Sequence, residues 1–389
     1  MNAPLPQRLS EDARTLKKLD LNLRRNKQQD HTTLLDQASK DFSWEAAKGE
    51  YWCPEEFSLM HGTPLWDEST GDQKRVLNQL YWVAYYSQII SAEIATIFFN
   101  QTSAAGLYGV EDFRVVCDTL DMESTQERAH INSFKVVGEA TEKALFGGRV
   151  FTYPMRTPYA ETMIYSDATP FKAWWKKLQL RTYTLLSSSN AFIACQYFTV
   201  RGIRTLSGKL IQHQLSMAHT KHAFPEASAL PAKISYYHFM DESYHFNSSN
   251  IISHDIIKCL PKPTAFEARV ANMTLAGCQR DHQGFSVGVR GIFWHDPALF
   301  EPLLKVLMSP IYGMDRAAAL AMIERCFCQD NDGVQSAYAT HKTALESYKQ
   351  YLADLDYVDA HNKEMRHMAR ASVEGYLKTN RRAFERFAA

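Results

Sequence analysis

Two short stretches of the chain carry potential metal ligands at one helical spacing, and this pattern constrains the fold more than any other feature. In the stretch His238-Phe-Met-Asp-Glu-Ser-Tyr-His245, the residues His238, Glu242 and His245 stand at positions i, i+4 and i+7. Because an α-helix turns by about 100° per residue, these positions fall within roughly 60° of one another. The sequence therefore predicts a helix with three ligand-type side chains on one face.

The second stretch repeats this spacing with Glu in place of the first His. Glu123, Glu127 and His130 again stand at i, i+4 and i+7. A single Glu-x-x-His is weak evidence, because charged helix faces produce it by chance. Two copies that share the same third position are far less expected by chance, so we predict two helices that face a common metal site.

The most apolar run of the chain, residues 73–101, contains one buried candidate, Glu93. The run is rich in aromatic residues, has Glu93 well inside it and lacks basic flanks, so we expect a central core helix and not a membrane span. A carboxylate buried in such a helix has to be protonated, hydrogen-bonded or bound to a metal. Viewed alone, this helix leaves both a structural Glu and a metal ligand open.

The bounds of three further helices follow from capping residues and periodicity. Acidic residues at Glu111-Asp112 and a glycine stop at Gly147 predict a long helix over 112–146. A helical pattern also covers 171–206, and the helix with His238 covers 226–249. With the apolar run, the chain has four helices long enough to build a bundle.

The helix over 171–206 is the unusual one, because it brings no carboxylate. No acid lies between Asp167 and Glu226, and Gln196 is the long polar side chain in the apolar middle of this helix. We therefore take Gln196 as the candidate ligand there. A neutral amide leaves a metal site more positive and binds an ion more weakly than a carboxylate does.

These elements predict an all-α fold: a ferritin-like four-helix bundle core with additional peripheral and C-terminal helices. Ferritin-like di-iron proteins take a Glu from each of two helices and a Glu-x-x-His from each of two others. We expect a polar N-terminal arm over 1–45, loosely held and with at most one short helix, and a metal-binding bundle over 46–260. A C-terminal helical layer over 261–389 would pack on the same domain.

Three elements of the sequence carry a family resemblance. They are Glu93, Glu127-Arg128-Ala129-His130, and His238 followed by Asp241-Glu242-Ser243-Tyr244-His245. On these elements the chain resembles the p-aminobenzoate N-oxygenase family of ferritin-like di-iron oxygenases. The additional imidazole one turn before the last Glu is the most specific point, and the resemblance covers residues 60–250.

The resemblance implies two iron ions that use dioxygen and an external reductant to oxidise a small-molecule amine to an N-oxygenated product. Manganese or a mixed-metal pair is left open. The implied metal ligands are Glu93, Glu127, His130, Gln196, His238, Glu242 and His245. Glu127 and Glu242 would bridge the ions, and Glu93 and His130 would hold one ion. His238 and His245 would hold the other, with Gln196 as a further candidate there.

Some positions stay open within this resemblance. Asp241 is a candidate for orienting a ligand imidazole on the neighbouring helix, and with the two bridging carboxylates it makes up the catalytic set. The family has a carboxylate where we place Gln196. Glu161 or Glu226 could take that position, or Glu123 could act as a spare ligand.

Other reactions and other classes of protein also fit these residues. The same site serves C-hydroxylation, desaturation or oxidative cleavage, and a ferritin-like protein with a degenerate site can be non-catalytic. A formal net charge of zero disfavours a broad grip on nucleic acid or on a membrane surface. Seven cysteines without a zinc-type spacing and an N-terminus without a signal pattern favour the cytoplasm. We also expect a homodimer and an electron donor that the sequence does not identify.

Overall fold

The computed structural model describes the chain over residues 7–151, 228–273 and 299–389, apart from 354, and over short pieces at 170–171, 174–175, 177–178 and 275–276. Within these ranges the regular secondary structure is helical, without strands, so the all-α prediction is confirmed. Of the helix expected over 171–206, only the short pieces at 171, 174–175 and 177–178 are described, and they are helical. The rest of it, with the candidate ligand Gln196, lies outside the described residues, and so do Glu161 and Glu226.

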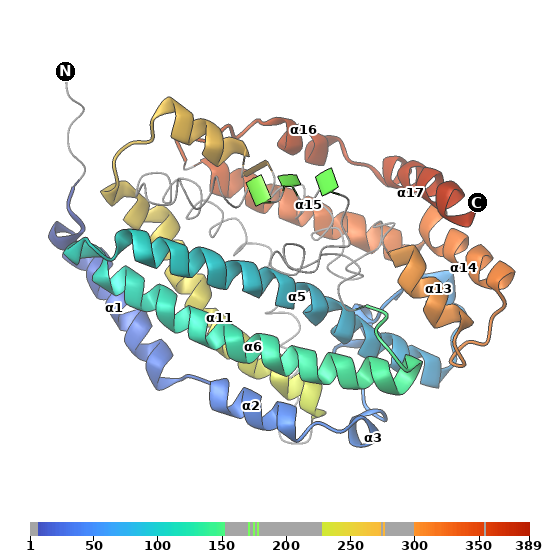
Figure 1. The fold of residues 1–389 in the computed structure, drawn as a ribbon. Helices are drawn as coiled ribbons and strands as arrows, with labels where there is room; N and C mark the ends of the chain where they lie inside the picture. Colours follow the sequence, from blue (N-terminus) through green and yellow to red (C-terminus); the bar gives the residue numbers. More distant parts are fainter. Residues whose placement is uncertain are drawn as a thin grey trace.

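Three long helices form the centre of the molecule (Figure 1). Thr70 and Gln73 form a reciprocal capping box at the start of the first helix. Gly147, with φ of 70°, ends the second in the left-handed conformation, as the sequence predicts. The third begins at Leu230, four residues after the predicted start at 226, and Pro231 occupies its first turn. The three helices are α5 (Gly71–Leu107), α6 (Arg114–Phe146) and α11 (Leu230–His254).

The acidic cap expected before α6 is wrong in detail. A 3-10 turn over Glu111–Phe113 precedes the helix, and Phe113 is the N-cap residue. The carboxylate of Asp112 instead accepts hydrogen bonds from the Ser10 hydroxyl at 2.8 Å and from the Arg8 guanidinium at 3.0 Å. The Asp112 side chain therefore binds residues that are distant in the sequence, although helix-capping preferences predicted that it would cap the helix.

Aromatic and indole contacts fix how the central helices are aligned. The Trp82 indole N–H on α5 donates to Ser235 Oγ at 2.9 Å and to the Pro231 carbonyl at 3.1 Å, both on α11. One turn further along both helices, the Tyr86 ring lies 5.8 Å from the His238 ring. The α5 and α11 helices therefore run in the same direction. The Phe134 ring of α6 stacks 4.0 Å from Tyr86.

The N-terminal segment is not a loose arm, contrary to the prediction from its composition. It forms two helices, α1 (Ala13–Gln28) and α2 (Thr32–Lys40), which pack along α6 and α11 (Figure 1). Leu19 and Leu35 are completely buried. The polar residues Asn22 and Asn26 are also buried, because they hydrogen-bond to the bundle. Composition gave the wrong prediction because some polar side chains of this segment lie on the face that packs against the bundle.

Shorter helices connect the N-terminal pair to α5 and extend the end of α11. Trp52 between them is buried at the centre of a cluster of aromatic rings, with Trp82 at 5.8 Å and Phe42 at 5.9 Å. The helices are α3 (Trp44–Ala47) and α4 (Pro64–Glu68), with 3-10 turns at Leu9–Glu11, Glu55–Phe57 and Ile256–Cys259.

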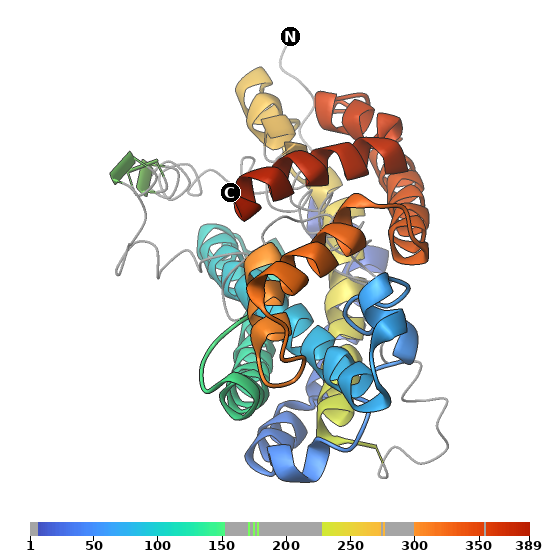
Figure 2. The ribbon, with the colours of Figure 1, turned by 90° about the vertical axis from the view of Figure 1, so that its right-hand side faces the viewer.

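The C-terminal residues form helices that lie on the opposite side of the bundle from α1 and α2 (Figures 1 and 2). Residues 265–273 are also helical. Phe300 and Phe327 are buried in the same apolar cluster as Trp82, so this layer and the start of α5 share one core. The C-terminal helices are α13 (Phe300–Met308), α14 (Arg316–Cys328), α15 (Asp332–Ala353), α16 (Lys363–Arg370) and α17 (Val373–Ala388).

The apolar character of α5 does not amount to a membrane span. Across the described part of the chain, no helix combines the length with the hydropathy needed to cross a bilayer. The aromatic side chains of α5 are instead buried against protein, with Tyr81 and Tyr85 fully covered.

The indole hydrogen bonds of Trp82 predict a measurable loss of stability in Trp82→Phe. This change leaves the Ser235 hydroxyl on α11 without its indole donor, while the Pro231 carbonyl still accepts from Ser235. We expect a loss of about 1–3 kcal/mol in the free energy of unfolding, measured by urea denaturation. Trp52→Phe is the matched control, because it removes one indole hydrogen bond, to the Ala47 carbonyl, and should cost less. Equal stability of Trp82→Phe and the wild type would contradict the role of this contact.

Candidate metal centre

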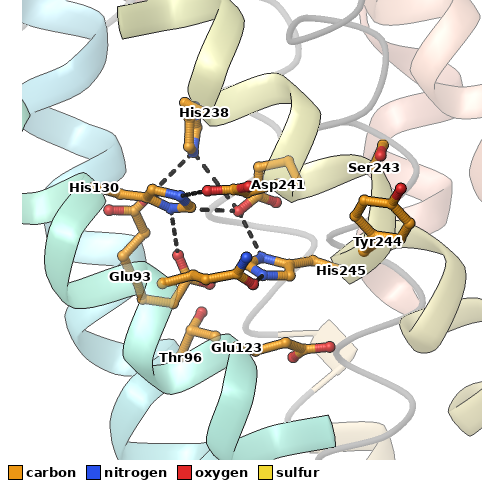
Figure 3. Close-up of polar contacts among 12 residues, drawn as sticks. Glu93, Thr96, Glu123, His130, His238, Asp241, Ser243, Tyr244 and His245 are labelled. Carbon is orange, nitrogen blue, oxygen red and sulfur yellow. Dashed lines mark hydrogen bonds and ion pairs between the residues drawn. The ribbon is translucent and has the colours of Figure 1, made fainter. Parts of the chain in front are cut away.

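Four side chains from three helices meet between α5, α6 and α11 (Figure 3). They are Glu93, His130, His238 and Glu242, and each offers one ligand atom within 4.8 Å of the others. The Nε2 atom of His238 lies 3.1 Å from Glu93 Oε1 and 3.6 Å from Glu242 Oε1. His130 Nδ1 lies 3.6 Å from the same Glu93 oxygen. Carboxylates and imidazoles at this spacing are suited to one transition-metal ion.

A second group of ligand atoms overlaps the first and shares Glu242. It consists of Glu127, Glu242 and His245, again within 4.8 Å of one another. His245 Nδ1 lies 2.8 Å from Glu242 Oε1 and 3.6 Å from Glu127 Oε1. Glu242 therefore stands between two groups, as a bridging carboxylate between two ions would.

The contact between Asp241 and His130 determines which imidazole nitrogen of His130 is available. Asp241 Oδ2 lies 3.2 Å from His130 Nε2. Burial alone would raise the pKa of Asp241, but hydrogen bonds with His130 and His31 lower it to about 2. The carboxylate is thus ionised and can only accept, so the proton resides on Nε2. The Nδ1 atom, which faces Glu93 and Glu127, is left free for a metal.

Two buried polar atoms of the first group have no hydrogen-bond partner among the described residues. They are Glu93 Oε2 and His238 Nδ1. Glu93 is only 5% exposed. A carboxylate oxygen that is buried without a hydrogen-bond partner costs free energy. Together with the oxygen and nitrogen donor set, this observation fits a bound metal ion better than a purely structural network.

The cluster mixes opposite charges in a buried volume, which shifts its pKa values. Burial, with the charges of Glu242 and Glu93, raises the pKa of Glu127 to about 7. Burial alone would lower the pKa of His245, but the charge and hydrogen bond of Glu242 outweigh it and raise the pKa to about 9. Hydrogen bonds with carboxylates, Asp241 first, likewise raise the pKa of His130 despite burial. Without metal, the site therefore holds protons at neutral pH.

The structure groups His238 differently from what the family resemblance implies. His238 lies with Glu93 and His130, and not with His245. Side chains on a helix lean toward its N-terminus, so Glu93 on α5 reaches back toward His238 on the parallel α11. Glu127 also contacts both groups, because its Oε1 lies 3.6 Å from His245 Nδ1 and its Oε2 lies 3.2 Å from His130 Nδ1.

The third residue of the α6 pattern, Glu123, does not join either group. Its carboxylate is buried and accepts hydrogen bonds from Ser248 and from Asn100 Nδ2 at 3.3 Å. Figure 3 shows Glu123 away from the contacts around His130. The two stretches have equal spacing, but Glu123 contacts different residues of α5 and α11 from those that surround the metal ligands.

Two residues beside the site were missed from the sequence. His31, between α1 and α2, contacts Asp241 at 2.9 Å, and Gln126 on α6 contacts His245 Nε2 at 2.9 Å. Gln126 directly precedes Glu127, and its amide is fully buried on a helix rich in charge. That local context was its one available signal, whereas nothing near His31 in the sequence indicated its partner.

The two groups predict that Glu127→Ala and His245→Ala lower the metal content of the protein below that of the wild type. Each change removes a ligand from the second group, which consists of Glu127, Glu242 and His245. Metal analysis after anaerobic loading with Fe(II) measures the result. Glu123→Gln is the matched control, because it alters a buried carboxylate on the same helix outside both groups. Full metal content in both alanine variants would refute the assignment.

The raised pKa values predict that metal affinity increases with pH. A metal must displace the protons held by Glu127, with a pKa of about 7, and by His245, with a pKa of about 9. We expect affinity for Mn(II) to rise steadily between about pH 6 and about pH 9, with protons released on binding. Calorimetric titration in buffers of different ionisation enthalpy measures both quantities. An affinity that is constant or falls over this range would contradict the prediction.

Comparison with known proteins supports the class of this site. Searches of curated proteins and of solved structures found no match. The model of a protein family described as acyl halogenase CylC-like matches residues 14–388, which includes the N-terminal helices and the C-terminal layer. This family lies in the di-iron ferritin-like superfamily, so the broader part of the resemblance holds, while its specific N-oxygenase part gains no support. The chain belongs to the acyl halogenase CylC-like family.

Proposed function

We propose that the chain is a dinuclear iron enzyme that uses dioxygen to halogenate the acyl part of a small molecule. The observation that carries the proposal is the pair of ligand groups that overlap at Glu242. Two iron ions held there would supply the redox chemistry that activates dioxygen. The residues of the chain bind and orient the ions, and they keep the surrounding volume closed to water.

Each ligand has a distinct place in this proposal. Glu93, His130 and His238 hold one ion, and Glu127 with His245 holds the other. Glu242 contributes to both. Asp241 keeps a proton on His130 Nε2 and so directs the Nδ1 lone pair toward the first ion. Since the ligands come from three helices, their positions depend on helix packing and not on a flexible loop.

The charge of the ligands favours the uptake of an anion. The three carboxylates of the two groups balance only part of the charge of two divalent ions. The sequence offers no acid between Asp167 and Glu226, where the family of N-oxygenases has a further carboxylate ligand. A halide would supply the missing negative charge. This argument, together with the family match, supports halogenation.

The overall reaction is balanced by an external reductant. Replacement of a C–H hydrogen by a halogen, with dioxygen as oxidant, consumes a halide, two electrons and three protons and releases two water molecules. The electrons come from a one-electron or two-electron donor in solution. The substrate contributes the carbon and loses one hydrogen.

N-oxygenation of an amine is the second candidate. It is favoured by His238, the additional imidazole one turn before Glu242, on which the resemblance to the N-oxygenases depends. The same centre and reductant would then insert an oxygen atom from dioxygen into an N–H bond. Hydroxylation, desaturation and oxidative cleavage at carbon use the same ligands and differ in the product.

The test is product analysis with iron-loaded protein. The protein is incubated with ¹⁸O₂, a reductant, bromide or chloride, and separate panels of fatty acids, their thioesters and arylamines. We expect a halogen isotope pattern in an acyl product, dependent on halide and lost in His245→Ala. Glu123→Gln should retain the activity.

The other outcomes separate the alternatives. ¹⁸O on nitrogen would favour N-oxygenation, and ¹⁸O on carbon would favour hydroxylation. Iron binding without any product or reductant-dependent uptake of dioxygen would favour a non-catalytic binding protein. Failure to bind iron, manganese or cobalt would overturn the proposal as a whole.

A further inference from the structure

Two chains of hydrogen bonds lead outward from the ligand imidazoles and end at consecutive residues. One runs from His130 to His31, and the other runs from His245 to Asp30. Both end residues lie in the turn between α1 and α2. The N-terminal helices thus reach both ligand groups from outside the bundle.

The chain to His31 passes through Asp241. The backbone N–H of His31 donates to Asp241 Oδ1 at 3.1 Å, and its Nδ1 lies 2.9 Å from the same oxygen. Because a carboxylate only accepts, His31 Nδ1 carries the proton in this contact. Two donors from one residue hold Asp241 Oδ1, so Oδ2 is directed at His130 Nε2.

The chain to Asp30 passes through Gln126. Gln126 and Asn26 form a reciprocal amide pair, with distances of 2.8 and 2.9 Å. Such a pair keeps both of its hydrogen bonds if the two amides flip together, so the pair alone does not define which Gln126 atom faces His245. Asp30 resolves this ambiguity. Its Oδ1 lies 3.3 Å from the Gln126 amide nitrogen, and a carboxylate requires a donor there.

The orientation of Gln126 then sets the tautomer of His245. With the amide nitrogen toward Asp30, the amide oxygen faces His245 Nε2 at 2.9 Å. An acceptor at this position requires the proton on Nε2 and leaves Nδ1 free. The Nδ1 atom is the one that faces Glu127 and Glu242.

We propose that Asp30 and His31 are positioning residues that fix the tautomers of His245 and His130, one residue for each metal ion. The inference rests on the proposed metal centre. It adds that the N-terminal helices are part of that centre and that the two ions depend on different residues of a single turn. Outer hydrogen bonds to ligand imidazoles are commonly worth 10–100-fold in metal affinity.

The test uses cobalt as a spectroscopic probe of full-length protein. Co(II) is titrated into His31→Ala and Asp30→Ala, and the two binding steps are followed by visible absorption. His238→Ala and His245→Ala, which each lack a ligand of one group, provide reference spectra for the separate ions. We expect His31→Ala to weaken the ion near Glu93, and Asp30→Ala to weaken the ion near Glu127, each by about tenfold or more.

Asn22→Ala is the matched control for loosening of the N-terminal helices. Asn22 is buried on α1 and donates to the Tyr244 carbonyl at 3.0 Å. Its loss therefore removes a contact between α1 and α11 but none of the hydrogen bonds that lead to His31 or Asp30. We expect normal cobalt binding in this variant, even if thermal unfolding shows a lower midpoint. Asn at position 31 offers an amide donor, so His31→Asn should restore binding, whereas the amide of Asp30→Asn can present a donor as readily as an acceptor to Gln126 and should weaken binding as Asp30→Ala does.

Each outcome has a separate meaning. If the wild type binds two Co(II) and both alanine variants titrate like Asn22→Ala, the positioning role is overturned while the metal centre stands. If the alanine variants lose affinity but His31→Asn does not recover it, or if Asp30→Asn binds like the wild type, these hydrogen bonds are not the cause and the proposal fails. If the wild type binds no cobalt, iron or manganese, the proposed function itself fails.

Discussion

Charge compensation inside the bundle is the constraint on which the rest of the structure depends. Glu93, Glu127 and Glu242 meet between three helices, where an uncompensated carboxylate would be strongly destabilising. Imidazoles from α6 and α11 supply hydrogen bonds and, when protonated, the opposite charge. Metal ions would take over that compensation and release the protons. The same side chains therefore determine both the free energy of unfolding and metal binding, so a substitution of one ligand is expected to change both.

The surrounding layers hold the three helices in the alignment that this cluster requires. The Trp82 indole connects α5 to α11 at Ser235, about one turn before His238, and Phe134 stacks against Tyr86 next to it. On the far side, Ser248 and Asn100 bind the Glu123 carboxylate. Polar contacts thus lie on both sides of the centre along the helices, and sliding of one helix past another would break several of them together.

Much of the site was predictable because helical periodicity is local. The spacing of Glu127 and His130, and of Glu242 and His245, brings ligands to one face whatever the tertiary structure, and the glycine at the end of α6 acts within its own turn. The assignment of partners was not predictable in this way. Glu123 matches His238 in spacing, but its neighbours on other helices decide that it binds Ser248 and not the cluster.

Composition was least informative for the N-terminal residues. A polar segment predicts a solvated arm, since little apolar surface is available for burial. Leu19 and Leu35 provide a small apolar face, and Asn26 adds a specific polar contact with Gln126 that no periodic pattern announces. The family resemblance had a similar limit. Shared ligands define the class of metal chemistry, whereas the atom that reacts depends on how the substrate is held.

The position of His31 in the chain has a consequence for biosynthesis. His31 is separated from Asp241 by 210 residues, and Asn26 from Gln126 by 100. Contacts of such high sequence separation form late, because long loops must close first. During translation α1 and α2 emerge at the beginning, but their partner on α11 is still unmade. The cluster of ligand side chains can thus assemble only after α11 has left the ribosome, which would make metal insertion at the proposed centre a late event in the maturation of the chain.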